Sequence, residues 1–203
     1  MTRFVLVRHG QTGWNKEARF RGRVDIDLDD MGMRQAAAVA ERLSRVQATA
    51  VYSSPLKRAM TTAEPIARRL GLEVVPLEGM NDMDFGNWEG RSVDEVREQD
   101  GELFDLWRHD PDVVRIPGGE TLDEVRDRVA VTLDELAASH EDCMLVLVTH
   151  RVVCKVLLCY LLGLDNSHFW QIAQDTAAVN CFHMADGRGT VSLINDTCHL
   201  RHL

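Results

Sequence analysis

The stretch that decides the fold is Phe4-Val5-Leu6-Val7-Arg8-His9-Gly10-Gln11-Thr12-Gly13-Trp14-Asn15. Its first four residues are apolar and two are β-branched, which predicts a buried strand. The strand ends on Arg8 and His9 and passes into a polar loop that contains glycine. Open α/β sheets bind their ligands beyond the carboxyl ends of their strands. Arginine is a planar binder of phosphate and neutral imidazole is a nucleophile, so Arg8 and His9 are candidate functional residues.

A second strand of the same kind lies far along the chain. Residues 144–149 are mostly apolar and His150 follows them at once. Residues 151–162 are apolar on nearly every side and predict a buried helix. His150 then lies at the N-terminus of that helix, where free N–H groups and the dipole favour an anion. Arg8 and His9 alone are also compatible with a surface arginine beside a hydrogen-bonded histidine, but two strand-end histidines favour one shared site.

The run Leu6-Val7-Arg8-His9-Gly10-Gln11-Thr12, with Asn15, resembles the signature of the histidine phosphatase superfamily, which includes the cofactor-dependent phosphoglycerate mutases. Further motifs follow in the family's order along nearly the whole chain. The resemblance implies a phosphoglycerate mutase-like α/β fold. We therefore expect a single three-layer domain over residues 1–203, with a mixed, mainly parallel sheet and helices on both faces.

The composition restricts the partners. The 203 residues include 23 Lys and Arg against 32 Asp and Glu, and the net charge of −9 argues against a nucleic acid or a membrane surface. The N-terminus enters a strand directly, with no signal-peptide h-region, and no apolar run is long enough to span a bilayer. The cysteines have no spacing pattern and lie mostly in apolar segments, so we expect reduced core thiols and a cytoplasmic location. They are Cys143, Cys154, Cys159, Cys181 and Cys198.

Helices and strands alternate between the two motifs. Apolar spacing predicts a helix over residues 30–43. Ser54 as N-cap and Pro55 as the first helical residue predict the start of the next helix, and Gly71 predicts its end. Short strands are predicted over residues 50–52 and 72–76.

Capping boxes and a hairpin pattern organise the second half. Ser92 with Glu95 predicts a helix that runs toward Trp107, and Thr121 with Glu124 predicts a second helix. Residues 178–184 and 190–194 predict a final antiparallel hairpin. Beyond it, Cys198, His199 and His202 lack a second group of ligands nearby in the sequence, so we expect a solvated tail there and no metal site.

The resemblance implies two further arginines at the phosphate pocket. Arg58 lies in Ser53-Ser54-Pro55-Leu56-Lys57-Arg58, which matches a family pattern whose arginine holds the phosphoryl group. Arg21 and Gly22 resemble the family's second phosphate-contact region, in which many members have Gln at the place of Arg21. A solvated basic run is the alternative for Arg21.

Three more residues are candidates for substrate binding. Asn15 belongs to the first motif. Glu120 lies in Pro117-Gly118-Gly119-Glu120-Thr121, which resembles the family's segment at the pocket mouth, and the polar residues 108–116 before it predict a lid or rim. Arg151 stands where many relatives have Gly, and it is either solvated or bound to a second anionic group of the substrate. Trp14 and Trp88 line the pocket rim or belong to the core.

The proton donor departs from the family pattern. The family's segment Glu-x-x-Phe-Gly-x-Trp-Glu-Gly supplies a glutamate as proton donor to the leaving group, and counting back from Phe85 puts Asp82 at that place. Aspartate is one methylene shorter than glutamate. Asp84 is the competing donor, and two ordinary turn carboxylates are a further alternative.

The resemblance implies hydrolysis of a small phosphomonoester in two steps. His9 attacks phosphorus to form a phosphohistidine, and water then hydrolyses it, while Asp82 protonates the leaving oxygen. Arg8, Arg58, His150 and Arg21 surround the phosphoryl oxygens, so no metal and no cofactor are required. The alternatives are a cofactor-dependent phosphoglycerate mutase and a catalytically weak phospho-ligand binding protein. The sequence leaves the oligomeric state open, a homodimer being one option.

Overall fold

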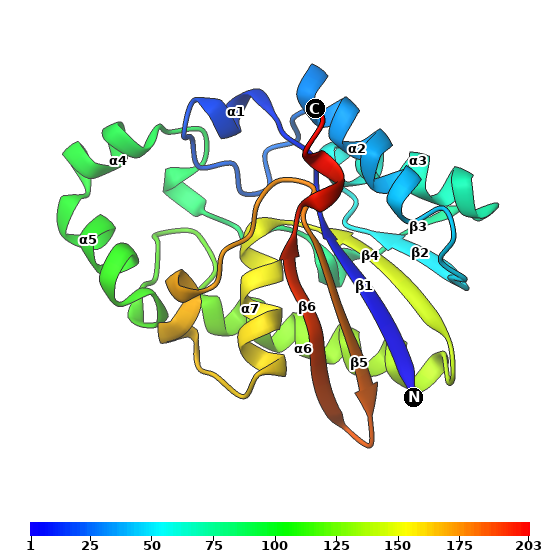
Figure 1. Ribbon diagram of the computed structural model, residues 1–203. Coiled ribbons are helices and arrows are strands. Elements are labelled where there is room, and N and C mark those ends of the chain that lie inside the picture. Colours follow the sequence, from blue (N-terminus) through cyan, green and yellow to red (C-terminus); the bar gives the residue numbers. More distant parts are fainter.

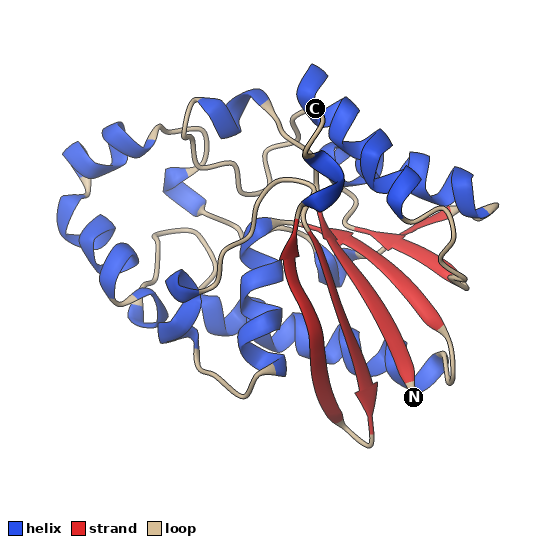
Figure 2. Cartoon of the chain, in the orientation of Figure 1, coloured by secondary structure: helices blue, strands red, loops and turns tan.

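Six strands form one mixed sheet in the order β3-β2-β4-β1-β5-β6 (Figures 1 and 2). The computed structural model describes residues 1–203. The first four strands pair in parallel, whereas β5 is antiparallel to both β1 and β6. The strands are β1 (Thr2–Arg8), β2 (Ala50–Ser53), β3 (Val74–Pro76), β4 (Met144–Thr149), β5 (Val179–Ala185) and β6 (Arg188–Asp196). The helices are α1 (Gly13–Lys16), α2 (Asp30–Arg42), α3 (Lys57–Leu70), α4 (Val93–Gln99), α5 (Gly101–His109), α6 (Leu122–Ser139) and α7 (Arg151–Leu161).

Alternating side chains of the central strands bury both faces of the sheet. In β1, Phe4 and Leu6 belong to a core of 28 buried residues that contains α6 and α7. Val5 and Val7 point to the opposite face and belong to a core of 14 residues shared with α2 and α3. This alternation is the period of two that a strand imposes. The predicted single α/β domain with a mixed, mainly parallel sheet and helices on both faces is confirmed.

Helices α4 and α5 extend the larger core beyond the sheet, at the left of Figure 1. Phe104 and Trp107 of α5 are buried there with Trp88. The ring of Trp88 packs against Phe20 and Phe104, with centroids 4.9 and 6.4 Å apart. Trp88 is thus a core residue and not a residue of the pocket rim.

Both capping boxes and the final hairpin form as predicted. Ser92 caps α4 and Thr121 caps α6, and in each case the carboxylate of the glutamate three residues later accepts from the N–H of the capping residue. The hairpin is β5 and β6. Gly71 ends α3 in the left-handed conformation, with φ 69°.

The predicted start of α3 is wrong. The helix begins at Lys57, with Leu56 at the N-cap and no side-chain cap. The N–H of Lys57 donates instead to Asp25 Oδ1, at 2.8 Å. Ser54 does not cap the helix because its hydroxyl lies 2.7 Å from Nε2 of His150, in a hydrogen bond that no local pattern reveals.

The helix predicted to run toward Trp107 is two helices, α4 and α5, which meet at Asp100. Asp100 has φ −129° and ψ 39°, outside the helical region. Its carboxylate accepts bonds from the indole N–H of Trp88 and from Arg91, at 3.1 and 2.6 Å. These bonds to the preceding loop hold Asp100 out of the helix, and the chain turns there.

The C-terminal tail is docked and not solvated. Residues Cys198–Leu200 form a 3₁₀ turn. Arg42 of α2 donates to Asp196 and Cys198, at 2.6 and 2.9 Å, and His199 Nε2 lies 3.0 Å from the carbonyl of Ala177. All five cysteines are free thiols, but Cys198 is exposed, so the expectation of core thiols is wrong for it. None of the helices is both long and apolar enough to cross a membrane.

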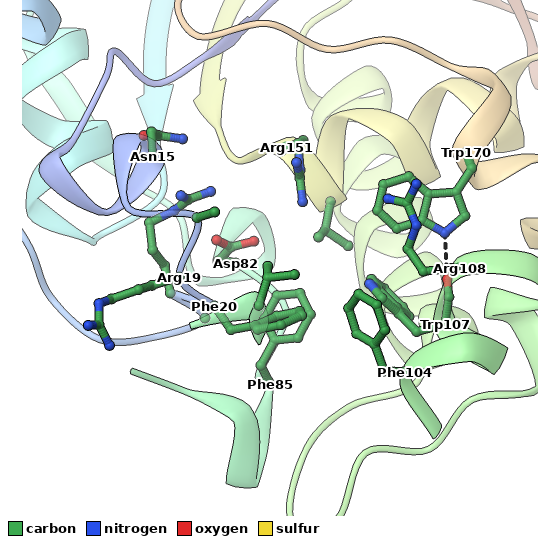
Figure 3. A pocket seen from close by; sticks show the side chains of 15 residues that line it. Asn15, Arg19, Phe20, Asp82, Phe85, Phe104, Trp107, Arg108, Arg151 and Trp170 are labelled. Carbon is green, nitrogen blue, oxygen red and sulfur yellow. Dashed lines mark hydrogen bonds between the residues drawn. The ribbon is translucent and has the colours of Figure 1, made fainter. Parts of the chain in front are cut away.

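A cavity of about 210 Å³ opens beside the carboxyl ends of the parallel strands (Figure 3). One part of its lining is polar and includes Arg21, Asp82 and Arg151. The other part is apolar and includes Phe20, Phe85, Phe104, Trp107 and Trp170. The segment predicted as a rim contributes Arg108 to this lining, whereas Val114 and Ile116 are buried in the core.

Candidate active site

His9 follows β1 directly and is fully buried. Its Nδ1 lies 2.6 Å from the carbonyl oxygen of Gly10, and its Nε2 has no partner. Because a carbonyl oxygen only accepts, Nδ1 carries the proton and Nε2 keeps its lone pair. Thr62 holds this loop in place, since its hydroxyl accepts from the N–H of Gly10 at 3.0 Å. The chain therefore presents one nitrogen with a free lone pair at the end of β1.

Burial lowers the pKa of His9 well below 6.5, and the charges of Arg58 and Arg8 lower it further. Desolvation disfavours the charged imidazolium, and neighbouring cations act in the same direction. His9 is therefore neutral at pH 7. The same cationic surroundings that attract an anion keep this ring unprotonated.

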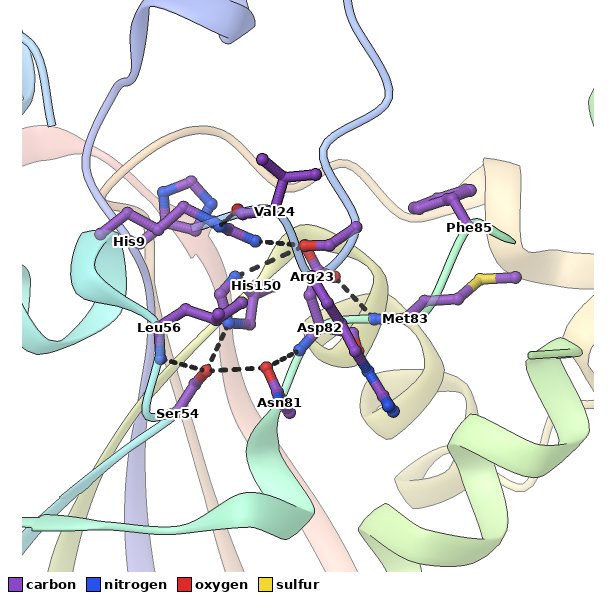
Figure 4. Close-up of polar contacts among 12 residues, drawn as sticks. His9, Arg23, Val24, Ser54, Leu56, Asn81, Asp82, Met83, Phe85 and His150 are labelled. Atoms are coloured by element: carbon purple, nitrogen blue, oxygen red, sulfur yellow. Dashed lines mark hydrogen bonds and ion pairs between the residues drawn. The ribbon is translucent and has the colours of Figure 1, made fainter. Parts of the chain in front are cut away.

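His150 lies beside His9, as the sequence predicts, with ring centroids 5.2 Å apart. It occupies the N-cap position of α7. Figure 4 shows its two contacts: Nε2 lies 2.7 Å from Ser54 Oγ, and Nδ1 lies 3.5 Å from Asp82 Oδ2. Burial and the charge of Arg58 lower the pKa of His150 well below 6.5.

Arg8 and Arg58 are held by backbone carbonyl groups. Arg58 donates to the carbonyls of Gly22 and Val24, at 2.6 and 2.8 Å, and Arg8 donates to that of Gln174 at 2.6 Å. Carbonyl oxygens orient a guanidinium without cancelling its charge. The Nε atoms of both arginines have no partner.

Arg21 joins this group of cations. Its Nε is also buried without a partner. Burial is the main cause that lowers the pKa of Arg8 to about 9 and that of Arg21 to about 10, and the charge of Arg151 lowers both further. Three crowded guanidinium groups with free N–H donors form a site for an anion such as a phosphoryl group.

The two candidate acids, Asp82 and Asp84, have different surroundings in the structure. Asp82 is buried and lines the cavity, with Oδ2 3.1 Å from Nη2 of Arg58. Its Oδ1 accepts from the N–H of Met83 at 3.0 Å. Asp84 instead closes a turn by accepting from the N–H of Gly86 at 2.8 Å, and it does not line the cavity.

Asn15, Gly22 and Arg151 also line the cavity. Asn15 Oδ1 accepts from the N–H of Thr12 at 2.9 Å, which closes the loop after β1. Gly22 has φ 51°, and a side chain there would collide with the carboxylate of Glu89. The Nε of Arg151 is buried without a partner.

Glu120 lies one layer behind the cavity. Its carboxylate binds Nε of Arg128 at 3.0 Å and the N–H of Asp84 at 2.9 Å. Arg128 in turn donates to the backbone carbonyl of Asp82 at 3.0 Å. Glu120 thus supports the loop that carries Asp82 and does not line the cavity. The buried residues Arg8, His9, Arg58 and His150 do not line it either, but Asp82, which does, lies 3.1 Å from Arg58 and 3.5 Å from His150.

Sequence reasoning missed several residues of this site. Ser54, which binds His150, follows β2 just as His9 follows β1, and that position is a signal that could have found it. Gln174 carries no such signal, because it holds Arg8 through its backbone. Trp107 and Trp170 line the cavity in place of the tryptophans singled out in the sequence.

No group of three or more His, Cys, Asp or Glu side chains is arranged to hold a metal ion. A family model, that of the histidine phosphatase superfamily (branch 1), matches residues 4–197. The chain belongs to this superfamily. The resemblance of the motifs and the phosphoglycerate mutase-like fold are thereby confirmed.

Individual relatives cover the chain almost completely. Phosphoserine phosphatase 1 of Hydrogenobacter thermophilus is 39% identical over 98% of this chain and 95% of its own length. The metal-independent phosphoserine phosphatase of Arabidopsis thaliana is 34% identical over 98% of this chain and 84% of its own length. The structure of Bacillus stearothermophilus YhfR superposes with a TM-score of 0.95 at 29% identity, over 99% of this chain and 100% of that one.

The burial of a neutral His9 predicts that the folded protein becomes less stable as the pH is lowered. Because the pKa of His9 is lowered in the folded chain, the unfolded chain binds one more proton between that pKa and about 6.5. The free energy of unfolding should therefore fall as the pH drops below 6.5, by up to about 1.4 kcal/mol per pH unit for this site. In His9→Gln, urea unfolding between about pH 7 and pH 5 should show a shallower decline than in the wild type.

His202→Gln, at an exposed position in the tail, is the matched control and should keep the wild-type slope. If His9→Gln and the wild type decline equally, His9 is not held neutral by the fold.

Proposed function

We propose that this chain is a phosphomonoester hydrolase that works through a phosphohistidine on His9. The observation that carries the proposal is the free Nε2 of a neutral, buried imidazole beside three arginines. Membership of the histidine phosphatase superfamily supports it, as do two relatives named phosphoserine phosphatases. Phosphoserine is therefore the first substrate to test.

In the first step, Nε2 of His9 attacks phosphorus in line with the leaving oxygen, so that the N–P bond forms as the P–O bond breaks. The 2.6 Å bond from Nδ1 to the carbonyl of Gly10 fixes the ring and keeps the proton on the nitrogen that does not react. Transition-state charge is spread over three phosphoryl oxygens. The residues proposed to stabilise it are Arg8, Arg21 and Arg58.

Asp82 donates the proton that the leaving oxygen needs. In the second step, the same carboxylate takes a proton from the water that attacks the phosphohistidine, since the acid of one step is the base of its reverse. His150 is held by Ser54 through Nε2. Its Nδ1 lies 3.5 Å from Asp82 Oδ2 without a hydrogen bond, and in this proposal it donates to the phosphoryl group.

The other candidate residues have supporting roles in this proposal. Gly22 orients Arg58 through its carbonyl, and Asn15 shapes the loop that follows His9. Arg151 faces the leaving group. Glu120 is a positioning residue, because it reaches Asp82 only through Arg128.

We also propose that the partner is a small-molecule phosphomonoester and that the protein is cytoplasmic. Five free thiols without a disulfide support a reducing compartment.

The proposed chemistry predicts activity without a metal. Side chains supply the positive charge that the phosphoryl group requires, and a relative in Arabidopsis thaliana is named metal-independent. Dialysis against EDTA should leave the rate of phosphate release unchanged. A loss of activity that Mg²⁺ restores would contradict this.

His9→Ala should abolish the release of phosphate from phosphoserine. The arginines remain, so the variant should still bind vanadate in calorimetry, which also shows that it is folded. The control is His202→Ala, which should retain wild-type turnover. Normal turnover by a folded His9→Ala variant would contradict the phosphohistidine mechanism.

A phosphoglycerate mutase assay separates the two uses of a phosphohistidine. A hydrolase gives the phosphoryl group to water, whereas a mutase returns it to the bound product. Interconversion of phosphoglycerates without phosphate release would show that the protein is a mutase and not a hydrolase. Vanadate binding without either activity would instead leave a phospho-ligand binding protein.

If Asp82 is the proton donor, its loss matters most for poor leaving groups. Asp82→Asn should lower the turnover of alkyl phosphates such as phosphoserine by about 10²–10⁴-fold. It should lower that of p-nitrophenyl phosphate much less, because p-nitrophenolate leaves without a proton. Steady-state kinetics on both substrates measure the difference.

Asp84→Asn is the matched control, because it changes the same charge two residues away and outside the cavity lining. It should affect the two substrates little and equally. Equal losses on both substrates in Asp82→Asn would make Asp82 a structural residue, and a leaving-group effect in Asp84→Asn would make Asp84 the acid.

A further inference from the structure

Three cationic side chains surround the indole ring of Trp170. The guanidinium carbons of Arg108 and Arg151 lie 4.6 and 5.8 Å from the ring centroid, and Nζ of Lys155 lies 4.4 Å from it. None of the three cations forms an ion pair or a side-chain hydrogen bond within the chain. We call these four residues the Trp170 cation cluster.

The Trp170 cation cluster borders the proposed phosphoryl site. Arg151 follows His150 in the sequence, and the acidic group that acts on it most strongly is Asp82. Arg108, Arg151 and Trp170 line the same cavity as Asp82, and Figure 3 shows them on its walls. The cluster therefore lies on the side of Asp82, where the leaving group of a bound phosphomonoester would be.

Positive charge in the cluster is not compensated by the chain. Burial, followed by the charges of Arg151 and Arg8, lowers the pKa of Lys155 to about 7. Contact with an aromatic face offsets only part of the cost of placing cations together. Acidic residues are in excess in this protein, at 32 against 23 basic ones, yet none pairs with these three.

The phosphoryl group does not account for these charges. The site around His9 has its own arginines, Arg8, Arg21 and Arg58, which present free N–H donors. The cavity wall also contains aromatic rings, among them those of Phe20, Phe85 and Phe104. A leaving group that suits this cavity combines a carbon skeleton with a second negative charge near Trp170.

We propose that the Trp170 cation cluster is a subsite for a second anionic group, a carboxylate or a second phosphate, carried by the leaving group of the substrate. The inference rests on the proposed phosphatase function and narrows it to doubly anionic phosphomonoesters. Arg108 and Arg151 supply the contacts, and Lys155 supports them from behind the indole ring.

The test compares substrates that differ only in the second anion. Phosphoserine is paired with phosphoethanolamine, which lacks the carboxylate, and 3-phosphoglycerate is paired with glycerol 3-phosphate. Propanediol bisphosphate is paired with propanediol monophosphate to test a second phosphate. In the wild type, kcat/KM should be at least about tenfold higher for the doubly anionic member, either in the two carboxylate pairs or in the bisphosphate pair. Charge-assisted hydrogen bonds to the second anion contribute that much.

Arg108→Gln should lower this preference by about tenfold, because it removes a charge at the cavity without touching the buried phosphoryl site. Arg97→Gln is the matched control. Arg97 also lies over an aromatic ring, that of Phe104 at 5.3 Å, but it is paired with Asp94 and does not line the cavity. The preference should be the same in Arg97→Gln and in the wild type.

Calorimetric binding of the same pairs to His9→Ala, with and without Arg108→Gln, tests the subsite independently of turnover. Release of phosphate without preference for a second anion would overturn the subsite and leave the phosphatase intact. Failure of every substrate to release phosphate would overturn the phosphatase, while a binding preference that Arg108→Gln removes would still support the subsite. Equal dissociation constants for the two members of every pair would overturn the proposed subsite.

Discussion

The parallel register between β1 and β4 is the constraint on which the rest of the structure depends. Arg8 pairs with Thr149, and the N–H of His9 donates to the carbonyl of Thr149 at 2.8 Å. Because both strands run in the same direction, His9 and His150 leave the sheet at the same edge, with their rings 5.2 Å apart. A slip of one residue would turn every side chain to the opposite face and separate the two histidines from the arginines.

At this edge the fold concentrates positive charge and leaves it largely unneutralised. Asp82 is the one buried carboxylate of the protein, while Arg8 and Arg58 are oriented by backbone carbonyls. A carbonyl fixes the direction of a guanidinium and leaves its charge available to a ligand. Burying charges in this way is costly for the folded chain. An anion bound at the site reduces that cost, so binding and stability are coupled here.

Local patterns in the sequence, together with the motifs that resemble the histidine phosphatase superfamily, predicted the fold class and the candidate site residues. Two apolar strands, each followed at once by a histidine, placed His9 and His150 at one end of a parallel sheet. The capping boxes at Ser92 and Thr121 determined where two helices begin, because a capping box needs only neighbours three residues apart. Arg58 was identified as a candidate by its motif, and the structure places it beside Asp82.

Only the tertiary structure decided which partners these residues have. Ser54 looks like a helix cap in the sequence, but its hydroxyl binds His150, 96 residues away. Asp82 and Asp84 are the same residue type two positions apart, yet Asp82 lines the cavity and Asp84 closes a turn. The cations around Trp170 come from α5 and α7, and Trp170 itself lies in a later 3₁₀ turn. Periodicity and capping report the conformation and burial of one segment, whereas these contacts depend on how distant segments pack, which no local pattern encodes.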